Sequence, residues 1–339
     1  MAKRKLSQHQ SRRIKKKQEA SNAKASSTLD AIDDQTLGAE QEGRVIAHYG
    51  TQVDIEYGEN ENIRCFLRAN LDPVITGDRI VWQRGEDLGV VVSCHPRTSL
   101  LSRPDTYGKL KPVAANVDQI IVTIAPQPEF FTNLIDRYLV VAELNQIKPL
   151  ILINKADLID DENAEKFADL KESYTSIGYQ VLLFSAKTEI GVEELTSQFR
   201  GKTSILVGQS GVGKSSILKL LMPEEEIQVG QLSDAKNKGR HTTTHSQLFH
   251  FSGGGECIDS PGIREFGLWN LDASDVIKGF VELNALTDQC KFRDCSHQHE
   301  PGCAIQNARK ENEISETRFI SYQRIVASLD DVQIKTPHK

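Results

Sequence analysis

Short alternating runs of hydrophobic and polar residues dominate the first third of the chain. Five such runs lie between Gly43 and Cys94, separated by turns rich in Gly, Asn, Asp and Pro. Alternation with a period of two is typical of half-buried strands, and five short strands within about 50 residues predict a small barrel. We interpret residues 41–95 as an OB-fold barrel, with an SH3-like barrel as the alternative. The turn-rich, basic segment 96–115 is interpreted as a linker able to touch phosphate.

From residue 116 onward, apolar runs alternate with segments of helical spacing. Residues 117–125, 148–157 and 179–187 each contain a buried-strand pattern, and the segments 134–145 and 162–178 between them have helical periodicity. Such alternation predicts parallel strands joined by crossover helices, with ligands bound beyond the carboxyl ends of the strands. We therefore expect an α/β domain over residues 116–278.

One loop of this domain has the pattern of a phosphate-binding loop. Residues 208–215 read G-x-x-x-x-G-K-S between an apolar run and a helix-like segment. Glycines let backbone N–H groups point at phosphate, Lys214 reaches the β and γ phosphates, and the Ser215 hydroxyl holds Mg²⁺. A purely structural strand–turn–helix is the alternative. The predicted contact set is Gly208, Gln209, Ser210, Gly211, Val212, Gly213, Lys214, Ser215 and Ser216.

Two polar strand ends indicate which base is bound. Asp157, in the sequence NKAD, can accept hydrogen bonds from the N1–H and the 2-amino group of guanine, and adenine offers neither donor. Asn154 is predicted to tie this segment to the phosphate loop, and the Lys155 stem to cover the base. The next strand ends in SAK (Ser185, Ala186, Lys187), where backbone N–H groups can meet guanine O6. An ATPase or kinase would leave both motifs without a purpose, so we predict GTP and GDP as ligands.

Downstream of the phosphate loop, two polar segments resemble switch regions. We expect one of Thr242, Thr243 and Thr244 to close over the γ-phosphate and ligate Mg²⁺, and we assign this role to Thr243. Asp259 is predicted to lie behind the Mg²⁺ and the Gly262 amide to sense the γ-phosphate.

The order of these motifs along the chain is unusual. In Ras-like GTPases the phosphate loop comes first, whereas here NKAD and SAK precede it. A circular permutation explains this order, because the strand contacts of the core survive when the old termini are joined and a new break falls in a loop.

Three cysteines and a histidine gather near the C-terminus. Cys290, Cys295, His297 and Cys303 offer three thiolates and an imidazole, a donor set suited to tetrahedral Zn²⁺. His299 is the alternative to His297 as the fourth ligand, and reduced free cysteines without a metal are the alternative to a zinc site. Four protein ligands leave no open position for catalysis, so we predict one structural zinc per chain in a domain over residues 279–339 that ends in a helix.

Charge is distributed unevenly along the chain. Residues 1–24 carry nine Lys or Arg against one Glu, a net charge of +8, which leaves −14 for the remainder because the whole chain carries −6. We interpret residues 1–40 as a basic tail that is disordered when free and whose partner is a polyanion such as RNA. No apolar run is long enough to span a bilayer and no signal-peptide core is present, so we expect a cytoplasmic protein without a membrane partner. The sequence shows neither a long heptad nor a broad apolar face, and we take a monomer as the default.

The permuted order, the preceding barrel, the sequences GRHTTT and DSPGIREFGLW, and the cysteine cluster together resemble the family of ribosome small subunit-dependent GTPase A (RsgA), bacterial late assembly factors. The resemblance covers residue 43 to the end of the chain. It implies an OB barrel, a permuted GTPase domain and a zinc domain, with the 30S subunit and its rRNA as partners that stimulate hydrolysis. It also favours His297 over His299 as the zinc ligand.

Hydrolysis of GTP requires an oriented water molecule. The glutamine that Ras-like proteins place after the DxxG glycine is replaced here by Ile263. His241 is the nearest suitable side chain, the resemblance implies this role for it, and His245 and His250 are the alternatives. The predicted catalytic set is therefore Lys214, His241 and Thr243, in an enzyme that is slow until a partner orders the switch. The alternative function is an RNA-binding module whose guanine-nucleotide site only stabilises the fold.

Overall fold

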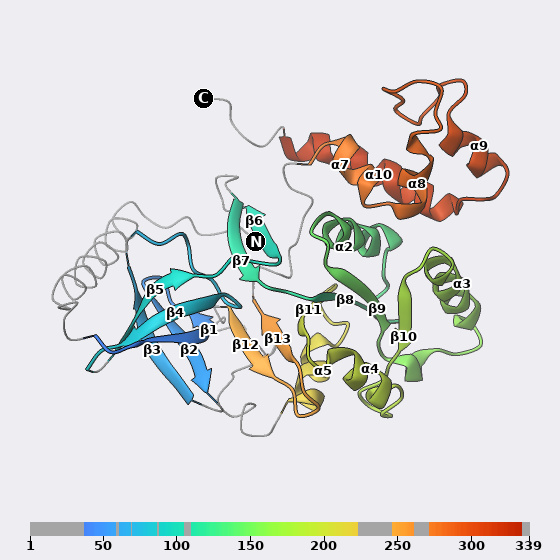
Figure 1. Cartoon of the computed structure of the whole chain (residues 1–339). Helices are drawn as coiled ribbons and strands as arrows, with labels where there is room; N and C mark the ends of the chain where they lie inside the picture. The colour runs from blue at the N-terminus through green and yellow to red at the C-terminus, as the bar shows by residue number, and fades with distance from the viewer. Residues whose placement is uncertain are drawn as a thin grey trace, which may run out of the picture. The chain divides into compact units, whose positions relative to one another are not determined.

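The computed structural model describes residues 37–58, 61–68, 70–86, 88–104, 110–222, 246–260 and 271–333. The chain divides into two compact units, Met1–Arg97 and Thr98–Lys339, whose elements are labelled in Figure 1. The basic tail predicted for residues 1–40 lies almost entirely outside the described residues.

The first unit is a closed five-stranded barrel. Its strands follow the order β1 (Glu40–His48), β2 (Gln52–Gly58), β3 (Glu61–Leu67), β5 (Gly89–Cys94) and β4 (Arg79–Arg84), and β4 pairs back onto β1. β3 and β5 are parallel, and the remaining pairs are antiparallel. The inward-facing side chains form a core that excludes water completely at Val45, Val53, Ile55, Ile80 and Trp82. The prediction of a small five-stranded barrel is confirmed.

The segment expected to be a linker contains a β-hairpin. Strands β6 (Leu100–Pro104) and β7 (Leu110–Ala115) pair antiparallel as a separate two-stranded sheet, with Leu101 opposite Ala114. Leu101 and Ala114 are buried, and burial of this face stabilises the hairpin. The prolines and basic residues of the segment made it resemble a turn-rich connection.

The second unit is built on a mostly parallel sheet. Its strand order is β10 (Gln180–Leu183), β9 (Lys148–Ile153), β8 (Gln119–Ile124), β11 (Thr203–Val207), β13 (Glu256–Asp259) and β12 (Gln247–His250). Neighbouring strands are parallel except β12 and β13, which are antiparallel. The carboxyl ends of the parallel strands therefore meet at one edge of the sheet, as the sequence predicts.

Helices cover both faces of this sheet (Figure 1). Helices α4 (Val192–Phe199) and α5 (Lys214–Leu221) pack on one face in a core that includes Phe199, Ile217 and Ile121. Helices α2 (Thr132–Leu144) and α3 (Ala164–Thr175) lie on the other face, where α2 contacts β8 and β9 and α3 contacts β10.

The C-terminal part is helical, as predicted. It comprises α7 (Ala273–Lys278), α8 (Val281–Thr287), α9 (Ala304–Lys310) and α10 (Glu316–Gln333). α7 packs against α8 and α10 and also against α2.

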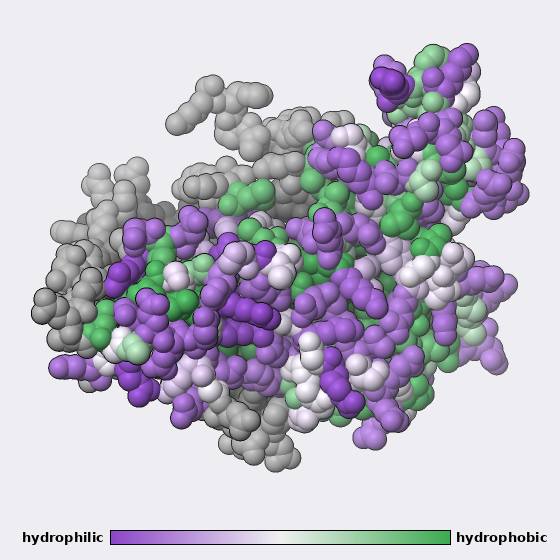
Figure 2. Space-filling view, viewed as in Figure 1, coloured by the Kyte–Doolittle hydropathy of each residue, from purple (hydrophilic) through white to green (hydrophobic). Residues whose placement is uncertain are grey.

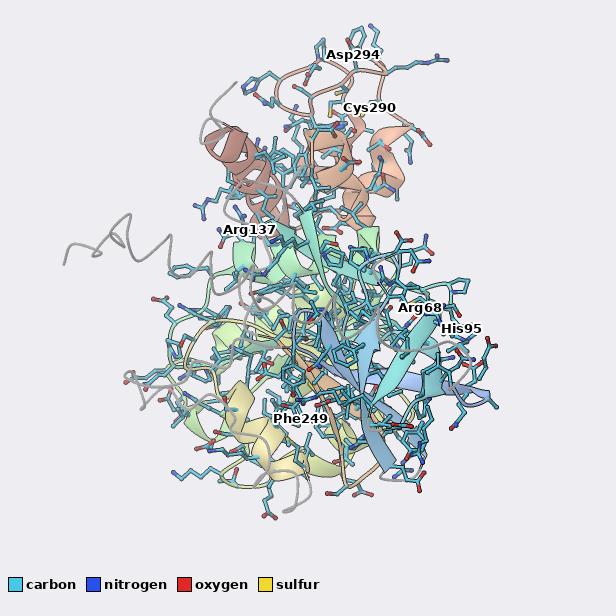
Figure 3. All side chains as sticks on the ribbon, turned by 90° about the vertical axis from the view of Figure 1, so that its left-hand side faces the viewer. Arg68, His95, Arg137, Phe249, Cys290 and Asp294 are labelled. Carbon is cyan, nitrogen blue, oxygen red and sulfur yellow. The ribbon has the colours of Figure 1, made fainter. Side chains whose placement is uncertain are left out.

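A buried ion cluster joins α10 to the α/β core. Arg318 on α10 forms ion pairs with Asp136 on α2 and with Glu282 on α8, the latter at 2.8 Å. The Tyr174 hydroxyl donates to Asp136 at 2.7 Å, and the guanidinium lies 4.4 Å from the centre of the Phe280 ring. Arg137 on α2 adds a hydrogen bond to Ser328 on α10 at 2.5 Å, and Figure 3 labels its position. These contacts fix the C-terminal helices on α2.

Among the residues that the structure describes, no helix combines the length and the apolar character that crossing a bilayer requires. Hydrophilic residues cover most of the face drawn in Figure 2.

Candidate functional site

The phosphate-binding loop connects β11 to α5 at the carboxyl edge of the sheet. Gly208 has φ +133°, and a Cβ atom there would lie 2.1 Å from the Thr123 carbonyl oxygen. Gly213 has φ +96°, and a Cβ atom there would lie 2.3 Å from Asn154 Nδ2. Both positions therefore require glycine, for conformation and for space.

Lys214 and Ser215 begin α5 directly below this loop. The Lys214 ammonium group donates hydrogen bonds to the carbonyl oxygens of Gly208 at 2.7 Å and of Gln209 at 2.8 Å. A small recess between α5 and β13 is lined by Lys214, Ser215 and Asp259 together with apolar residues. A hydroxyl and a carboxylate in one recess beside a phosphate loop are the oxygen donors that Mg²⁺ prefers. Ser210 and Ser216 are exposed, whereas Val212 is buried.

The NKAD segment is bound to the phosphate loop. Asn154 Nδ2 donates to the Val212 carbonyl at 2.8 Å, which is the tie that the sequence predicts. Lys155 adopts φ +58° and its ammonium group donates to the Gly211 carbonyl at 2.8 Å and to the Gln127 carbonyl at 2.7 Å. The two side chains thus join the NKAD segment to the phosphate loop.

Ser185 orients the carboxylate proposed to read the base. The Ser185 hydroxyl donates to Asp157 Oδ1 at 2.5 Å, and the Lys187 ammonium lies 3.9 Å from Asp157 Oδ2. Ser185 is completely buried, and Ala186 packs against the hydrophobic core. NKAD and SAK therefore meet at the ends of the adjacent strands β9 and β10, as parallel neighbours must.

Several predicted site residues lie outside the described residues. These are His241, Thr242, Thr243, Thr244 and Gly262, together with the alternative His245. The other alternative, His250, lies in β12 with Nδ1 3.9 Å from Oε1 of its strand neighbour Glu256, so it faces a neighbouring strand.

The cysteine cluster has the spacing of a tetrahedral metal site. One ligand atom from each of Cys290, Cys295, His297 and Cys303 lies within 4.8 Å of the others. His297 Nδ1 is 3.6 Å from Cys290 Sγ and 3.5 Å from Cys303 Sγ, and these two sulfurs are 4.0 Å apart. A tetrahedral zinc ion with bonds of about 2.3 Å to sulfur and 2.05 Å to nitrogen places a nitrogen and a sulfur ligand about 3.6 Å apart, and two sulfur ligands about 3.8 Å apart. The residues present therefore fit a zinc ion.

Burial and neighbouring groups shift the pKa values of side chains in and beside this cluster. Burial, together with the neighbouring Cys303, raises the pKa of the Cys295 thiol to about 12. Burial lowers the pKa of His297, so its imidazole is neutral at neutral pH and available as a ligand. Hydrogen bonds from Ser296 hold the pKa of Glu300 at about 2. His299 is not part of the cluster. Figure 3 labels Cys290 near the helices and Asp294 in the loop beyond it.

Comparison with known proteins places the chain in a family. The model of the RsgA GTPase family matches residues 94–269, and the small ribosomal subunit biogenesis GTPase RsgA of Saccharophagus degradans is 52% identical over 99% of this chain and 100% of that protein. The chain belongs to the RsgA GTPase family. A protein with the same description from Pseudomonas fluorescens is 51% identical over 98% of this chain and 99% of its own length.

Solved structures confirm the permuted RsgA fold. YjeQ from Thermotoga maritima is 34% identical with a TM-score of 0.71, over 86% of this chain and 99% of that chain. YloQ, described as a circularly permuted GTPase, is 29% identical with a TM-score of 0.69, over 89% of this chain and 98% of that chain. The predictions of a GTPase and of a circular permutation are both confirmed.

Sequence reasoning missed three contributors to the two sites. The Gln127 carbonyl accepts a hydrogen bond from Lys155, and only the adjacent Pro128 marked this turn in the sequence. Glu300, and Gln306 on α9, bind the backbone of the cysteine loop. Glu300 lies within the cysteine motif and Gln306 follows it closely, but no local pattern indicates which backbone groups they meet.

Proposed function

We propose that this chain binds GTP, hydrolyses it when the small ribosomal subunit orders its switch segments, and leaves the subunit after hydrolysis, as a late assembly factor. The proposal rests on the hydrogen bonds by which Asn154 and Lys155 join the NKAD segment to the phosphate loop. The relatives named small ribosomal subunit biogenesis GTPase RsgA support the choice of partner.

The residues of the nucleotide site have distinct parts in binding. Asp157, oriented by Ser185, accepts the two guanine donors, and this pairing excludes adenine. The amides of residues 209–215 and the Lys214 ammonium group neutralise phosphate charge. Mg²⁺ that arrives with GTP supplies further positive charge beside the β and γ phosphates, and Ser215 would hold it with Asp259 behind. His241, Thr243 and Gly262 remain the predicted catalytic, Mg²⁺-binding and γ-phosphate-sensing residues.

The cysteine cluster is proposed to hold one structural zinc ion. Its four protein donors, Cys290, Cys295, His297 and Cys303, complete a tetrahedral shell, so the ion would stabilise the loop between α8 and α9 and take no part in hydrolysis. The proposed domains are the tail 1–40, the barrel 41–95, the connection 96–115, the GTPase 116–278 and the zinc-binding domain 279–339.

The barrel is proposed to contact rRNA. Arg64 lies over the partly exposed ring of Tyr49 at 4.6 Å, and Arg84 lies over the ring of Tyr57 at 5.6 Å. Paired aromatic and guanidinium groups on a barrel surface suit stacking with unpaired bases and contact with phosphate. The basic tail would add a nonspecific phosphate contact. We further propose that the protein acts in the cytoplasm as a monomer.

Sedimentation with purified small subunits tests the release cycle. The chain is expected to co-sediment more strongly with a non-hydrolysable GTP analogue than with GDP, because only a difference in affinity between the two states can drive release. Asp157→Asn is the matched variant, since it should need a higher concentration of the analogue for the same binding. Equal co-sedimentation with both nucleotides would favour the RNA-binding module with a structural nucleotide.

A further inference from the structure

A single carboxylate organises residues 295–303, the segment that contains three of the four proposed metal ligands. One oxygen of Glu300 accepts hydrogen bonds from the amide of Ser296 at 2.8 Å and from its hydroxyl. The other oxygen accepts from the amides of Gln298 at 3.0 Å and His299 at 3.1 Å. Ser296 and Gln298 flank His297 on either side, so these bonds fix the backbone at a ligand.

The carbonyl groups of the same loop have a separate partner. Gln306 on α9 donates from Nε2 to the carbonyl oxygens of His297 at 2.7 Å and Gln298 at 3.0 Å. The Cys303 amide donates to the Glu300 carbonyl at 3.3 Å, which closes the turn that leads into α9. Glu300 therefore binds donors and Gln306 binds acceptors of one short segment.

The conformation held in this way is one that the loop would not adopt readily by itself. His297 has φ +60°, in the left-handed region that residues with a Cβ seldom occupy. In that conformation its Nδ1 lies 3.6 Å from Cys290 Sγ and 3.5 Å from Cys303 Sγ, at the separations a tetrahedral ion requires.

We propose that Glu300 is the positioning residue of this metal site. Glu300 is not a ligand itself, but it holds the backbone around His297 so that the ligand atoms are in place. The inference rests on the proposed zinc site. Metal affinity depends on such outer contacts, because a ligand that is already oriented loses less conformational freedom when the ion binds.

Glu300→Gln tests this role with little change of shape. The amide keeps one oxygen, and its NH₂ group replaces the other, so two of the four donors in the loop lose their acceptor whichever way the amide turns. Glu313→Gln is the matched control, because it removes the same charge from an exposed glutamate in the turn before α10.

The measurement is competition for Zn²⁺ between the full-length chain and a chromophoric chelator. Glu300→Gln should weaken zinc binding by about 10- to 100-fold, the usual cost of losing an outer contact, and Glu313→Gln should leave it unchanged. With saturating Co²⁺ the thiolate-to-cobalt charge-transfer band should persist in Glu300→Gln, because all three thiolates remain. Retained GDP binding would show that the GTPase core is folded.

Equal zinc affinity of wild type and Glu300→Gln would overturn the proposal. If Glu300→Gln does not fold, Ser296→Ala is measured instead. It removes one of the four hydrogen bonds to Glu300 and should cause a smaller loss of zinc affinity. Unchanged zinc affinity in Ser296→Ala would then overturn the proposal. A wild-type chain that binds no zinc would overturn the proposed metal site and with it the role of Glu300. A wild-type chain that binds zinc as tightly as the variant would overturn the role of Glu300 alone.

Discussion

Replacing Arg318 with methionine is the sharpest test of how the second unit is held together. Arg318 is 2% exposed, and its two partners are also withdrawn from water, Asp136 at 0% and Glu282 at 13%. Methionine fills much of the same volume but leaves two buried carboxylates without a cation. Breaking a buried pair in this way costs about 3–5 kcal/mol of the free energy of unfolding, or roughly 10 °C in Tm for a unit of this size.

Urea denaturation followed by circular dichroism measures this loss, and two variants calibrate it. Asp136→Asn leaves a balanced pair of Arg318 and Glu282, so it should cost less, about 1.5–3 kcal/mol for one charge-assisted hydrogen bond. Lys278→Met breaks an exposed ion pair with Asp275 at 3.0 Å and should cost less than about 1 kcal/mol.

The loss in Arg318→Met should also depend on pH. Burial raises the pKa of Asp136, and Arg318 opposes that rise. Without Arg318 the pKa of this carboxyl in the folded state rises further above its unfolded value, so the folded state takes up a proton as pH falls. The deficit relative to wild type should therefore be largest at neutral pH and shrink on acidification. A deficit below about 1 kcal/mol, or one independent of pH, would show that Arg318 does not stabilise the second unit through these buried carboxylates.

Three further predictions concern the two sites. Gly208→Ala should weaken GDP binding by about 10- to 100-fold in a fluorescence titration, because backbone strain of about 1–3 kcal/mol and the close approach to Thr123 displace the loop. Gly178→Ala is the control, because Gly178 also has a positive φ but a Cβ atom there would meet no other atom. Asp157→Asn should lower GTP affinity by about 100-fold or more and improve XTP binding, measured by calorimetry; unchanged preference would contradict the assignment of the base. Chelation should release one zinc per chain by mass spectrometry and reduce helicity while GDP binding persists, whereas coupled loss of nucleotide would contradict a purely structural ion.

The sequence predicted the barrel, the parallel sheet and the binding loops because each depends on local pattern. The alternation of Val45 and Ala47, or of Val53 and Ile55, places one face of each barrel strand inward, and the structure buries those side chains. The ends of parallel strands necessarily share an edge, so Asp157 and Ser185 could be expected to meet.

The ion cluster could not be predicted, because it depends on pairing between distant helices. Asp136 and Arg318 are separated by 182 positions, and an arginine in a helix of mixed polarity is typical of a solvent-facing side chain. The β6–β7 hairpin was missed for a different reason: its short strands contain prolines and basic residues, and its stability comes from burial of Leu101 and Ala114.

Activation of this GTPase by the small ribosomal subunit can be measured directly. Release of phosphate from GTP should be measured with the purified chain alone and with purified small subunits, under conditions where co-sedimentation shows binding. We predict slow turnover alone and stimulation approaching 10³-fold, about the lower end of what partner-supplied groups provide in other GTPases. Bound subunits that leave turnover unchanged would contradict the account.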